Sequence, residues 1–188
     1  MKKVISLYGL PACGKTTQAE KLSKEFGLYQ FGMGDRIRAE IQSGSELGQK
    51  IKVMNDAGVL VPDELMIEII KHCGDQARET GMIFDGFPRM ASQAEMLDDI
   101  LSKSGLTIDR LFYLKISREE AIRRINERAA ITGRADDKDL DAVNNRLGVF
   151  NEQSTALLDH YRKQGKLIEI DGGKDIETVF ASIKSSLK

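Results

Sequence analysis

Residues 9–16, GLPACGKT, carry the first pattern with recognisable chemistry. They match Gly-x-x-x-x-Gly-Lys-Ser/Thr, in which glycines let backbone N–H groups turn toward phosphates and a helix N-terminus adds partial positive charge. Lys15 is expected to reach the β- and γ-phosphates, and the Thr16 hydroxyl is expected to ligate Mg²⁺. An apolar run precedes this loop and a helical pattern follows it, as the motif requires. The sequence therefore predicts a site for a nucleoside triphosphate.

Other proteins that use such a loop leave signatures that this chain lacks. There is no Asn-Lys-x-Asp motif for guanine and no Asp-x-x-Gly motif for sensing a γ-phosphate, which argues against a nucleotide switch or a motor. Neither His72 nor His160 belongs to a His-Arg-Asp catalytic loop, so a protein kinase is not predicted either. The remaining use of the triphosphate is transfer of its terminal phosphate to a second molecule.

Arginine is concentrated in one part of the chain. Six of the twelve arginines lie within residues 118–146, where Arg124 and Arg128 are four positions apart and share one helix face. Two more, Arg38 and Arg89, follow the ends of the second and third predicted strands. Some of these arginines could simply pair with neighbouring glutamates on the surface. The interpretation that we favour is that most of them bind phosphate oxygens.

An excess of arginine suits a site that brings two anions together. Forked guanidinium groups bind phosphate oxygens bidentately and stabilise the charge that spreads over a transferring phosphoryl group. A phosphate acceptor has a second pKa of about 6 and is mostly ionised at neutral pH, so it needs no general base. Because the sequence offers no catalytic histidine, a phosphate acceptor is favoured over an alcohol.

Length and composition predict one soluble domain. The chain has 188 residues, a formal net charge of −1 and 30% charged residues, which argues against general nucleic-acid binding. It has no run of about 18 apolar residues, and Pro11 and Gly14 interrupt the N-terminal apolar segment, so neither a membrane span nor a signal peptide is expected. Cys13 and Cys73 form neither a disulfide framework nor a zinc ligand set. We expect a cytoplasmic protein.

Short apolar runs alternate with helical patterns along the chain. The runs predict strands at 3–8, 28–31, 82–85, 110–116 and 166–171. Helices are predicted at 15–26, 34–42, 46–57, 63–80, 90–104, 117–130, 138–164 and 175–187, and Ser117 with Glu120 forms a capping box. This alternation predicts an α/β three-layer sandwich of the P-loop NTPase type, with a five-stranded parallel sheet flanked by helices and ligands above the carboxyl ends of the strands. The helices at 34–42 and 46–57 are poor in apolar residues and look like a small helical excursion from the core.

Several stretches together resemble the adenylate kinase family of nucleoside monophosphate kinases, from residue 3 to about residue 185. They include GLPACGKTTQAEKL, DGFPR followed four residues later by Gln93, TGRADD and RLGVFNEQSTALLDHYRKQG. The DGFPR and TGRADD stretches are highly specific to that family. The resemblance implies the fold given above and reversible transfer of a phosphoryl group from MgATP to AMP, which gives two ADP.

The resemblance also implies roles on the ATP side. Lys15 would lie at the centre of the phosphate-binding residues 12–17, and Asp85 would hold Mg²⁺ through water. Arg124 would pack on the adenine as a planar guanidinium, and the backbone of residues 172–174 would border the same ring. The implied ATP-binding set is Ala12, Cys13, Gly14, Lys15, Thr16, Thr17, Arg124, Arg128 and Lys174, and the implied metal set is Thr16 and Asp85.

On the acceptor side, the resemblance implies that Arg38 and Arg89 clamp the monophosphate while Gln93 binds the edge of the base. The implied AMP-binding set is Met33, Arg38, Val59, Leu60, Val61, Gly86, Phe87, Pro88, Arg89, Gln93, Arg134 and Arg146. The implied catalytic set, gathered round the transferring phosphoryl group, is Lys15, Arg89, Arg128, Arg134 and Arg146.

The chain resembles the short-lid form of the family. Six positions separate Arg128 from Arg134, where longer members carry an extra and sometimes zinc-bearing lid, so we expect no structural zinc. A single domain is expected over 1–188, with a core at 1–32, 63–126 and 138–188, a monophosphate-binding segment at 33–62 and a short lid at 127–137. We expect a monomer that binds ATP and AMP and neither nucleic acid nor a membrane.

The identity of the acceptor base rests on few residues. A carboxamide such as that of Gln93 can meet both the amino donor and the ring-nitrogen acceptor of adenine, whereas uracil reverses that polarity. In the resembling family, glutamine at this position goes with adenine and asparagine with pyrimidines. Met33 stands where adenylate kinases usually have threonine, which weakens this argument. UMP, CMP or another nucleoside monophosphate is therefore the alternative acceptor, and a nucleotide-binding protein without catalysis is a further alternative.

Overall fold

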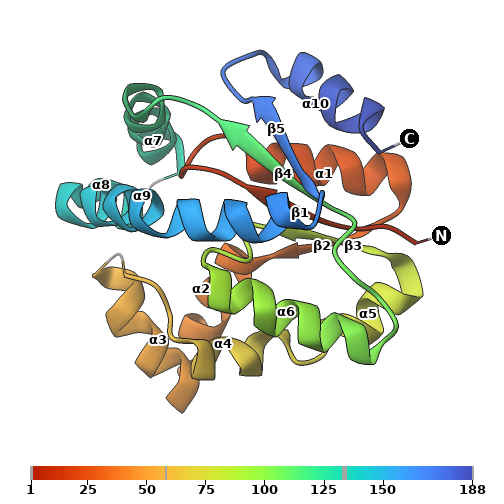
Figure 1. The fold of residues 1–188 in the computed structure, drawn as a ribbon. Helices are drawn as coiled ribbons and strands as arrows, with labels where there is room; N and C mark the ends of the chain where they lie inside the picture. The colour runs from red at the N-terminus through yellow and green to blue at the C-terminus, as the bar shows by residue number, and fades with distance from the viewer. Residues whose placement is uncertain (1, 58, 133–134, 188) are drawn as a thin grey trace.

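The centre of the molecule is a sheet of five parallel strands (Figure 1). A computed structural model describes residues 2–57, 59–132 and 135–187. The strands are β1 (Val4–Tyr8), β2 (Tyr29–Gly32), β3 (Met82–Asp85), β4 (Arg110–Lys115) and β5 (Leu167–Asp171), in the order β2-β3-β1-β4-β5. Every neighbouring pair runs parallel. The predicted strands and the predicted parallel sheet are confirmed, with strand bounds that differ by one residue at most.

Helices connect the strands and cover both faces of the sheet (Figure 1). Their bounds are α1 (Lys15–Phe26), α2 (Met33–Ser43), α3 (Glu46–Asp56), α4 (Asp63–Ile70), α5 (Cys73–Thr80), α6 (Ala91–Lys103), α7 (Arg118–Thr132), α8 (Ala135–Lys138), α9 (Leu140–Lys163) and α10 (Ile176–Ser185). In the described part of the chain, no helix is long and apolar enough to cross a membrane.

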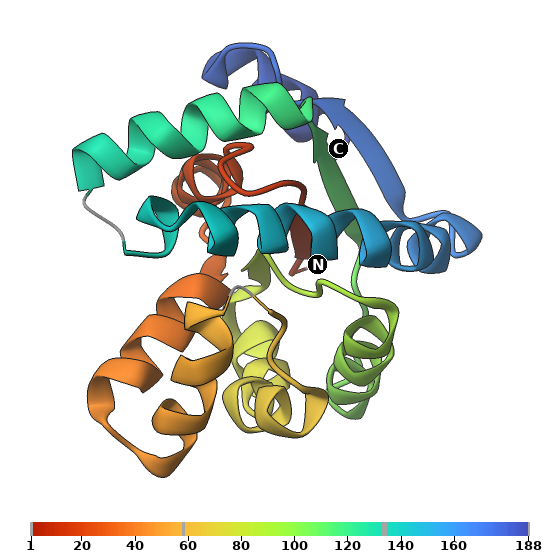
Figure 2. The ribbon, with the colours of Figure 1, turned by 90° about the vertical axis from the view of Figure 1, so that its left-hand side faces the viewer.

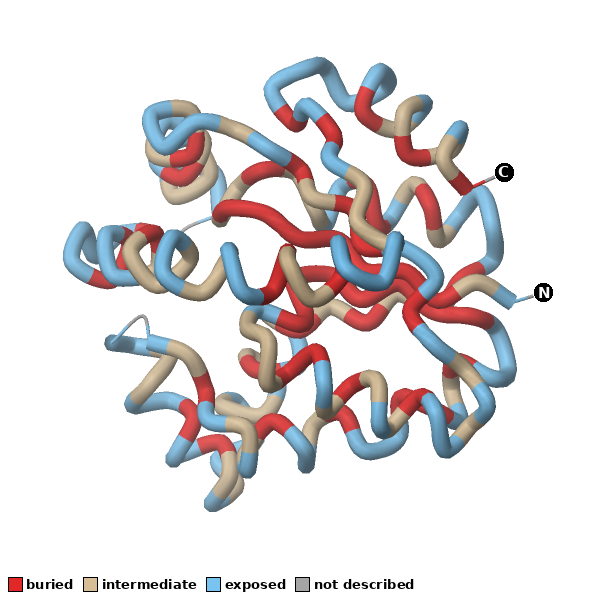
Figure 3. The backbone as a smooth tube through the Cα atoms, viewed as in Figure 1, coloured by how far each residue is buried: buried red, intermediate tan, exposed pale blue. Residues whose placement is uncertain are grey.

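Two apolar layers enclose the sheet, so that its central strands are buried on both faces (Figure 3). Ile5 and Leu7 of β1 pack against α1 and α10, whereas Val4 and Tyr8 join the layer that β1 shares with α2, α4, α5, α6 and α9. Burial on both sides explains why β1 is an almost continuous apolar run rather than an alternating one. Because Leu7 pairs with Asp85, the carboxyl ends of β1 and β3 lie side by side.

The single helix predicted at 63–80 is wrong. The segment forms α4 and α5, which are separated by a turn at Lys71 and His72. Gly74 lets α5 pack closely on α6, because a β-carbon there would lie 2.6 Å from Ser104 Oγ and 3.0 Å from the carbonyl oxygen of Ile100. The turn lets α5 approach α6 this closely while α4 turns its own apolar side toward the core.

Capping side chains determine where two further helices, α7 and α9, begin. Ser117 Oγ accepts a hydrogen bond from the backbone N–H of Glu120 at 3.1 Å, which is one half of the predicted capping box, while the Glu120 carboxylate pairs with Arg123 and Arg124. The helix predicted from 138 begins two residues later as α9, because the side chain of Asp139 accepts from the backbone N–H groups of Asp141 and Ala142 at 2.9 and 3.2 Å.

The excursion between β2 and β3 is the helix pair α2–α3, which lies at the lower left of Figure 2. The first helix stays with the core by burying Met33 and Ile37. The second helix packs closely on the first at Gly48, where a β-carbon would lie 2.1 Å from the carbonyl oxygen of Glu40. Glycine is therefore required at this position for the observed distance between the two helices.

We expect Gly48→Ala to lower the free energy of unfolding by about 1–3 kcal/mol, because the added methyl group overpacks the α2–α3 contact. Gly148→Ala in α9 is the matched control. Nothing outside its own helix lies within 4 Å of a β-carbon at Gly148, so alanine should raise the free energy of unfolding by up to about 1 kcal/mol. Denaturant titration measures both values, and equal changes in the two variants would contradict the close contact.

Candidate active site

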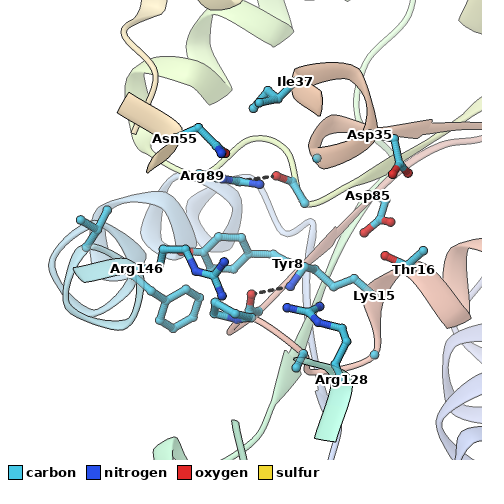
Figure 4. A pocket seen from close by; sticks show the side chains of 18 of the residues that line it. Tyr8, Lys15, Thr16, Asp35, Ile37, Asn55, Asp85, Arg89, Arg128 and Arg146 are labelled. Carbon is cyan, nitrogen blue, oxygen red and sulfur yellow. Dashed lines mark hydrogen bonds between the residues drawn. The ribbon is translucent and has the colours of Figure 1, made fainter. Parts of the chain in front are cut away.

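A cavity of about 530 Å³ opens at the carboxyl ends of β1 and β3 (Figure 4). In Figure 2, α7 lies above this end of the sheet and the α2–α3 pair lies below it, with the first half of α9 between them. Among the residues that the structure describes, six cationic side chains line the cavity against two acidic ones, so these walls carry a net positive charge. The cations are Lys15, Arg38, Arg89, Arg124, Arg128 and Arg146, and the acids are Asp35 and Asp85.

Two glycines shape the backbone of the phosphate loop. Gly9 has a φ of 147°, and a β-carbon there would lie 2.5 Å from the carbonyl oxygen of Leu114. Gly14 has a φ of 101° and directly precedes the first residue of α1. Both angles lie in the region that favours glycine. The loop and the first turn of α1 line the cavity, where a helix N-terminus offers unpaired backbone N–H groups to an anion.

The Lys15 ammonium group donates to acceptors of its own loop. The carbonyl oxygens of Gly9 and Leu10 lie 2.8 and 2.9 Å from Nζ, and Cys13 Sγ lies at 3.5 Å. These contacts hold the positive charge at the mouth of the loop. A phosphate that enters the cavity would accept hydrogen bonds from the same ammonium group and therefore compete with the two carbonyl oxygens.

Asp85 ends β3 beside the phosphate loop, and its carboxylate faces the side of Thr16 (Figure 4). Both residues line the cavity, although Asp85 is only 7% exposed. A carboxylate and a hydroxyl are oxygen donors, which Mg²⁺ combines with phosphate oxygens and water. The pair therefore fits a Mg²⁺ ion that arrives with a nucleotide. Within the described ranges, no three His, Cys, Asp or Glu side chains are grouped closely enough to hold a metal ion alone.

Arg89 lies on the loop that follows β3, where its Nε donates to the carbonyl oxygen of Gly86 at 2.9 Å. The Arg89 side chain is exposed to solvent where it faces the cavity. Protein atoms nevertheless displace part of its hydration, and this loss, followed by the nearby charge of Arg146, lowers the pKa of the Arg89 guanidinium. Arg38 acts in the same direction and forms an ion pair with Asp35. Asp85 acts in the opposite direction and offsets these effects only in part, so an anion would bind favourably beside Arg89.

Asp137 joins two of the arginines. Its side chain is completely buried and accepts hydrogen bonds from Arg128 Nε at 2.7 Å, from Arg128 Nη2 at 2.9 Å and from Arg146 Nη2 at 2.9 Å. Burial alone would raise the pKa of Asp137, but the hydrogen bonds from the two arginines outweigh it and hold the pKa below its usual range. One carboxylate thus connects α7, α8 and α9 at the edge of the cavity.

Arg124 lines the cavity and also pairs with an acid. Its Nε donates to Glu120 Oε1 at 2.6 Å. Arg123, on the outside of the same helix, pairs with Glu120 and Glu127. Hydrogen bonds from Arg123 and then from Arg124 lower the pKa of Glu120 to about 2. Of these two neighbouring arginines, Arg123 only pairs with glutamates on the surface. Arg124 also reaches the cavity, where it could bind a ligand.

Most of the residues that the sequence indicates meet in this cavity. Its lining includes Ala12, Gly14, Lys15, Thr16, Thr17, Arg38, Val59, Leu60, Asp85, Gly86, Arg89, Arg124, Arg128 and Arg146. Seven indicated residues do not belong to its lining, namely Cys13, Met33, Val61, Phe87, Pro88, Gln93 and Lys174. Arg134 lies outside the described residues.

Residues behind the lining support it from the core. Met33 is fully buried among apolar side chains of the α2 layer. Gln93 is 1% exposed, and its Oε1 accepts a hydrogen bond from the backbone N–H of Arg89 at 2.9 Å. Gln93 therefore fixes the loop that carries Arg89. Its contact with the edge of a base stays a prediction. Lys174 lies exposed in the turn after β5.

Sequence reasoning missed several residues of the lining. They are Tyr8, Gly34, Asp35, Ile37, Asn55, Val149 and Phe150, whereas Gly9 and Pro11 belong to the predicted phosphate loop. Val149 and Phe150 follow Arg146 by three and four residues in α9, so helical periodicity could have placed them on the same face. Asn55 carries no comparable signal, because it comes from α3, whose contact with the cavity depends on tertiary packing.

Asp137→Asn should lower the free energy of unfolding at neutral pH by on the order of 1–3 kcal/mol, because two arginines lose a buried charged partner. The folded pKa of Asp137 lies below its ordinary value of 3.8. Its stabilising effect is therefore present above about pH 4 and is lost as the pH falls through the lowered pKa.

Denaturant titrations of wild type and variant across this pH range measure the difference. Asp159→Asn, which removes an exposed ion pair with Arg162 on the same helix α9, is the control and should change stability by less than about 1 kcal/mol. A wild-type advantage over Asp137→Asn that stayed constant down to about pH 2 would contradict the assigned pairing.

Comparisons with known proteins agree with this geometry. The sequence model described as "Adenylate kinase" matches residues 7–166. An adenylate kinase of a Caulobacter species is 46% identical over 182 residues, which cover 96% of each chain. The adenylate kinase of Methanosarcina barkeri is 40% identical with 98% of each chain covered, and that of Phocaeicola vulgatus is 38% identical with 98% of this chain and 97% of its own covered. On the strength of these full-length matches, and of a phosphate loop that faces a ring of arginines, the chain belongs to the adenylate kinase family.

Proposed function

We propose that the chain is a nucleoside monophosphate kinase that transfers the terminal phosphoryl group of MgATP reversibly to AMP, giving two ADP. The observation that carries this proposal is that a phosphate loop and a cluster of arginines line one cavity together. A protein that only bound a triphosphate would not need Arg38 and Arg89 on the opposite side of that cavity. Membership of the adenylate kinase family supports the same reaction.

The donor site of this proposal is the phosphate loop with its neighbours. Residues 12–17 would hold the phosphates of ATP, while Lys15 exchanges its two carbonyl partners for phosphate oxygens. Thr16 and Asp85 would hold Mg²⁺, which would supply positive charge to offset that of the phosphates. Arg124 would lie against the adenine, and Lys174 would border it from the turn after β5. These roles follow from the lining of the cavity and from the family.

The acceptor site would be built from α2, residues 59–61 and the loop after β3. Arg38 and Arg89 would clamp the monophosphate in a cavity where, among the described residues, cationic side chains outnumber acidic ones. Val59 and Leu60 line the cavity next to α2 and would contact the base or the ribose. Behind them, Gln93 would hold Arg89 in place and present its amide group to the base. We accordingly assign residues 33–62 as the monophosphate-binding segment. Gly86, which lines the cavity, would bind AMP together with Phe87 and Pro88, and Met33 and Val61 would do so from the segment itself.

Transfer would depend on positioning and charge, because an ionised phosphate oxygen needs no general base to attack. Arg128, Arg146 and Arg134 would surround the transferring phosphoryl group. Since Asp137 holds Arg128 and Arg146, the phosphoryl group must compete with this carboxylate for their N–H groups. We propose that residues 127–137 act as a short lid. Its closure would exclude water, which would otherwise accept the phosphoryl group.

We also propose that the enzyme acts in the cytoplasm on free nucleotides and works as a monomer. The monomer is supported by the fact that one chain supplies the phosphate loop, the acceptor wall and the arginines of the same cavity. A second copy is therefore not required to complete the site.

Lys15→Ala should reduce ADP formation from MgATP and AMP to less than about a hundredth of the wild-type rate, because one lost electrostatic donor typically costs 10²–10³ in rate. The fold should stay intact, since Lys15 faces the cavity and donates its described hydrogen bonds to atoms of its own loop. Lys24→Ala, on the exposed side of the same helix, is the matched control and should keep full activity. Activity in Lys15→Ala above that limit would contradict the assigned role.

AMP should be the preferred acceptor, with a kcat/KM that exceeds those for CMP and UMP by at least about tenfold, or about 1.4 kcal/mol. The reason is that the carboxamide of Gln93 matches adenine in a site large enough for a purine. Measuring diphosphate formation from MgATP with each monophosphate tests both the reaction and the base. A kcat/KM for CMP or UMP equal to that for AMP would refute the preference for adenine. If no diphosphate formed with any monophosphate, the proposed reaction would be refuted.

A further inference from the structure

Tyr8 is the last residue of β1 and directly precedes Gly9 of the phosphate loop. It lines the cavity, yet the residue as a whole is only 3% exposed. Among the residues that the structure describes, none is placed to form a hydrogen bond with its buried hydroxyl group. A tyrosine hydroxyl that is buried almost always has such a partner, so this one calls for an explanation.

Neighbouring rings hold the side chain of Tyr8 in one orientation. The ring of Phe150 stacks on it at a centroid distance of 5.1 Å and an angle of 21°, and the ring of Tyr113 lies at 5.8 Å and 46°. Phe150 lies one helical turn after Arg146, and Tyr113 pairs with Tyr8 across the sheet. The hydroxyl group therefore cannot turn away to find another partner without disrupting this aromatic cluster.

The charges around this hydroxyl are positive. Figure 4 shows the Tyr8 ring reaching into the region of Arg89 and Arg146. Arg89 interacts electrostatically with Tyr8 and is itself affected by the charges of Arg146 and Arg38. A guanidinium group has N–H donors and no acceptor, so none of these arginines can accept the proton of the hydroxyl group. An anion bound by the arginines would supply the missing acceptor.

The protonation state of Tyr8 agrees with a role as a donor. Burial and the neighbouring Tyr113 raise the pKa of the Tyr8 hydroxyl above its ordinary value of 10.0, and the opposing effect of Arg89 is smaller. The group is therefore a neutral phenol at any physiological pH and cannot serve as a base. It has one O–H to donate, and it lies next to arginines that attract phosphate oxygens.

We infer that the hydroxyl group of Tyr8 donates a hydrogen bond to a phosphate oxygen of the acceptor monophosphate, beside Arg38 and Arg89. The inference rests on the proposed function and adds a binding residue to it. The acceptor phosphate is preferred over the phosphates of the donor because Tyr8 interacts with Arg89, which stands on the acceptor side. Lys15 and the N-terminus of α1 serve the donor side instead.

A role in packing alone would predict a different residue. Phenylalanine would keep both ring contacts and would spare the protein an unsatisfied buried hydroxyl, which costs stability. If the hydroxyl serves substrate binding, its removal should leave the melting temperature of the free protein unchanged or higher while it weakens AMP binding. These two effects have opposite signs, and a structural role would lower stability and affinity together.

The test is Tyr8→Phe, with equilibrium binding measured separately for AMP, adenosine and ATP by calorimetry. We expect the Kd for AMP to rise by about tenfold or more, as for loss of a hydrogen bond to a charged group. The Kd values for adenosine, which has no phosphate, and for ATP should change by less than about twofold. Tyr113→Phe is the matched control, because this residue belongs to the same aromatic cluster but does not line the cavity.

Each other result would overturn the inference. An unchanged Kd for AMP would leave Tyr8 with packing only, and an equal loss for AMP and adenosine would make its effect structural. A loss confined to ATP would move the hydroxyl to the donor phosphates. Failure of the proposed function is seen independently, as the absence of ADP formation from MgATP and AMP by the wild-type protein.

Discussion

Crowding of positive charge around one cavity is the constraint on which the rest of this structure depends. Lys15 and five arginines line about 530 Å³, where they repel one another and lose part of their hydration. The fold tolerates this because oxygen atoms of the protein compensate the cations. Carbonyl oxygens do so for Lys15 and Arg89, and carboxylates such as Asp137 do so for Arg128 and Arg146. These partners keep the cations in place, and phosphate oxygens could replace them as acceptors of the same hydrogen bonds.

The order of the strands brings these charges together from distant parts of the sequence. β1 lies between β3 and β4, so the phosphate loop that follows β1 meets Asp85 and Arg89, which follow β3. At Gly9 the backbone passes so close to Leu114 of β4 that no side chain fits. The phosphate loop and Arg89 therefore share the same sheet edge, and the helices α7 and α9 add their arginines to the cavity there.

Sequence was sufficient for features that depend on local patterns. The strands, the phosphate loop around Lys15 and the α/β class were predicted because short-range spacing encodes them. The turn at 71–72 was missed, since it results from the packing of α5 on α6 rather than from a helix-breaking residue. The link between Asp137 and two helices, and the burial of Gln93 behind Arg89, could not be predicted either. Both depend on which side of an element faces the cavity in three dimensions.

The internal partners of the cations have a consequence for the lifetime of bound nucleotides. A phosphate that binds to Lys15, Arg128 or Arg146 replaces an existing partner, so the net gain in free energy is smaller than the number of cations implies. When a nucleotide dissociates, the carbonyl oxygens and Asp137 can take the vacated positions at once. These carbonyl oxygens and the Asp137 carboxylate would therefore shorten the residence time of a product. In a reaction that runs in both directions, this keeps the release of either pair of nucleotides comparably easy.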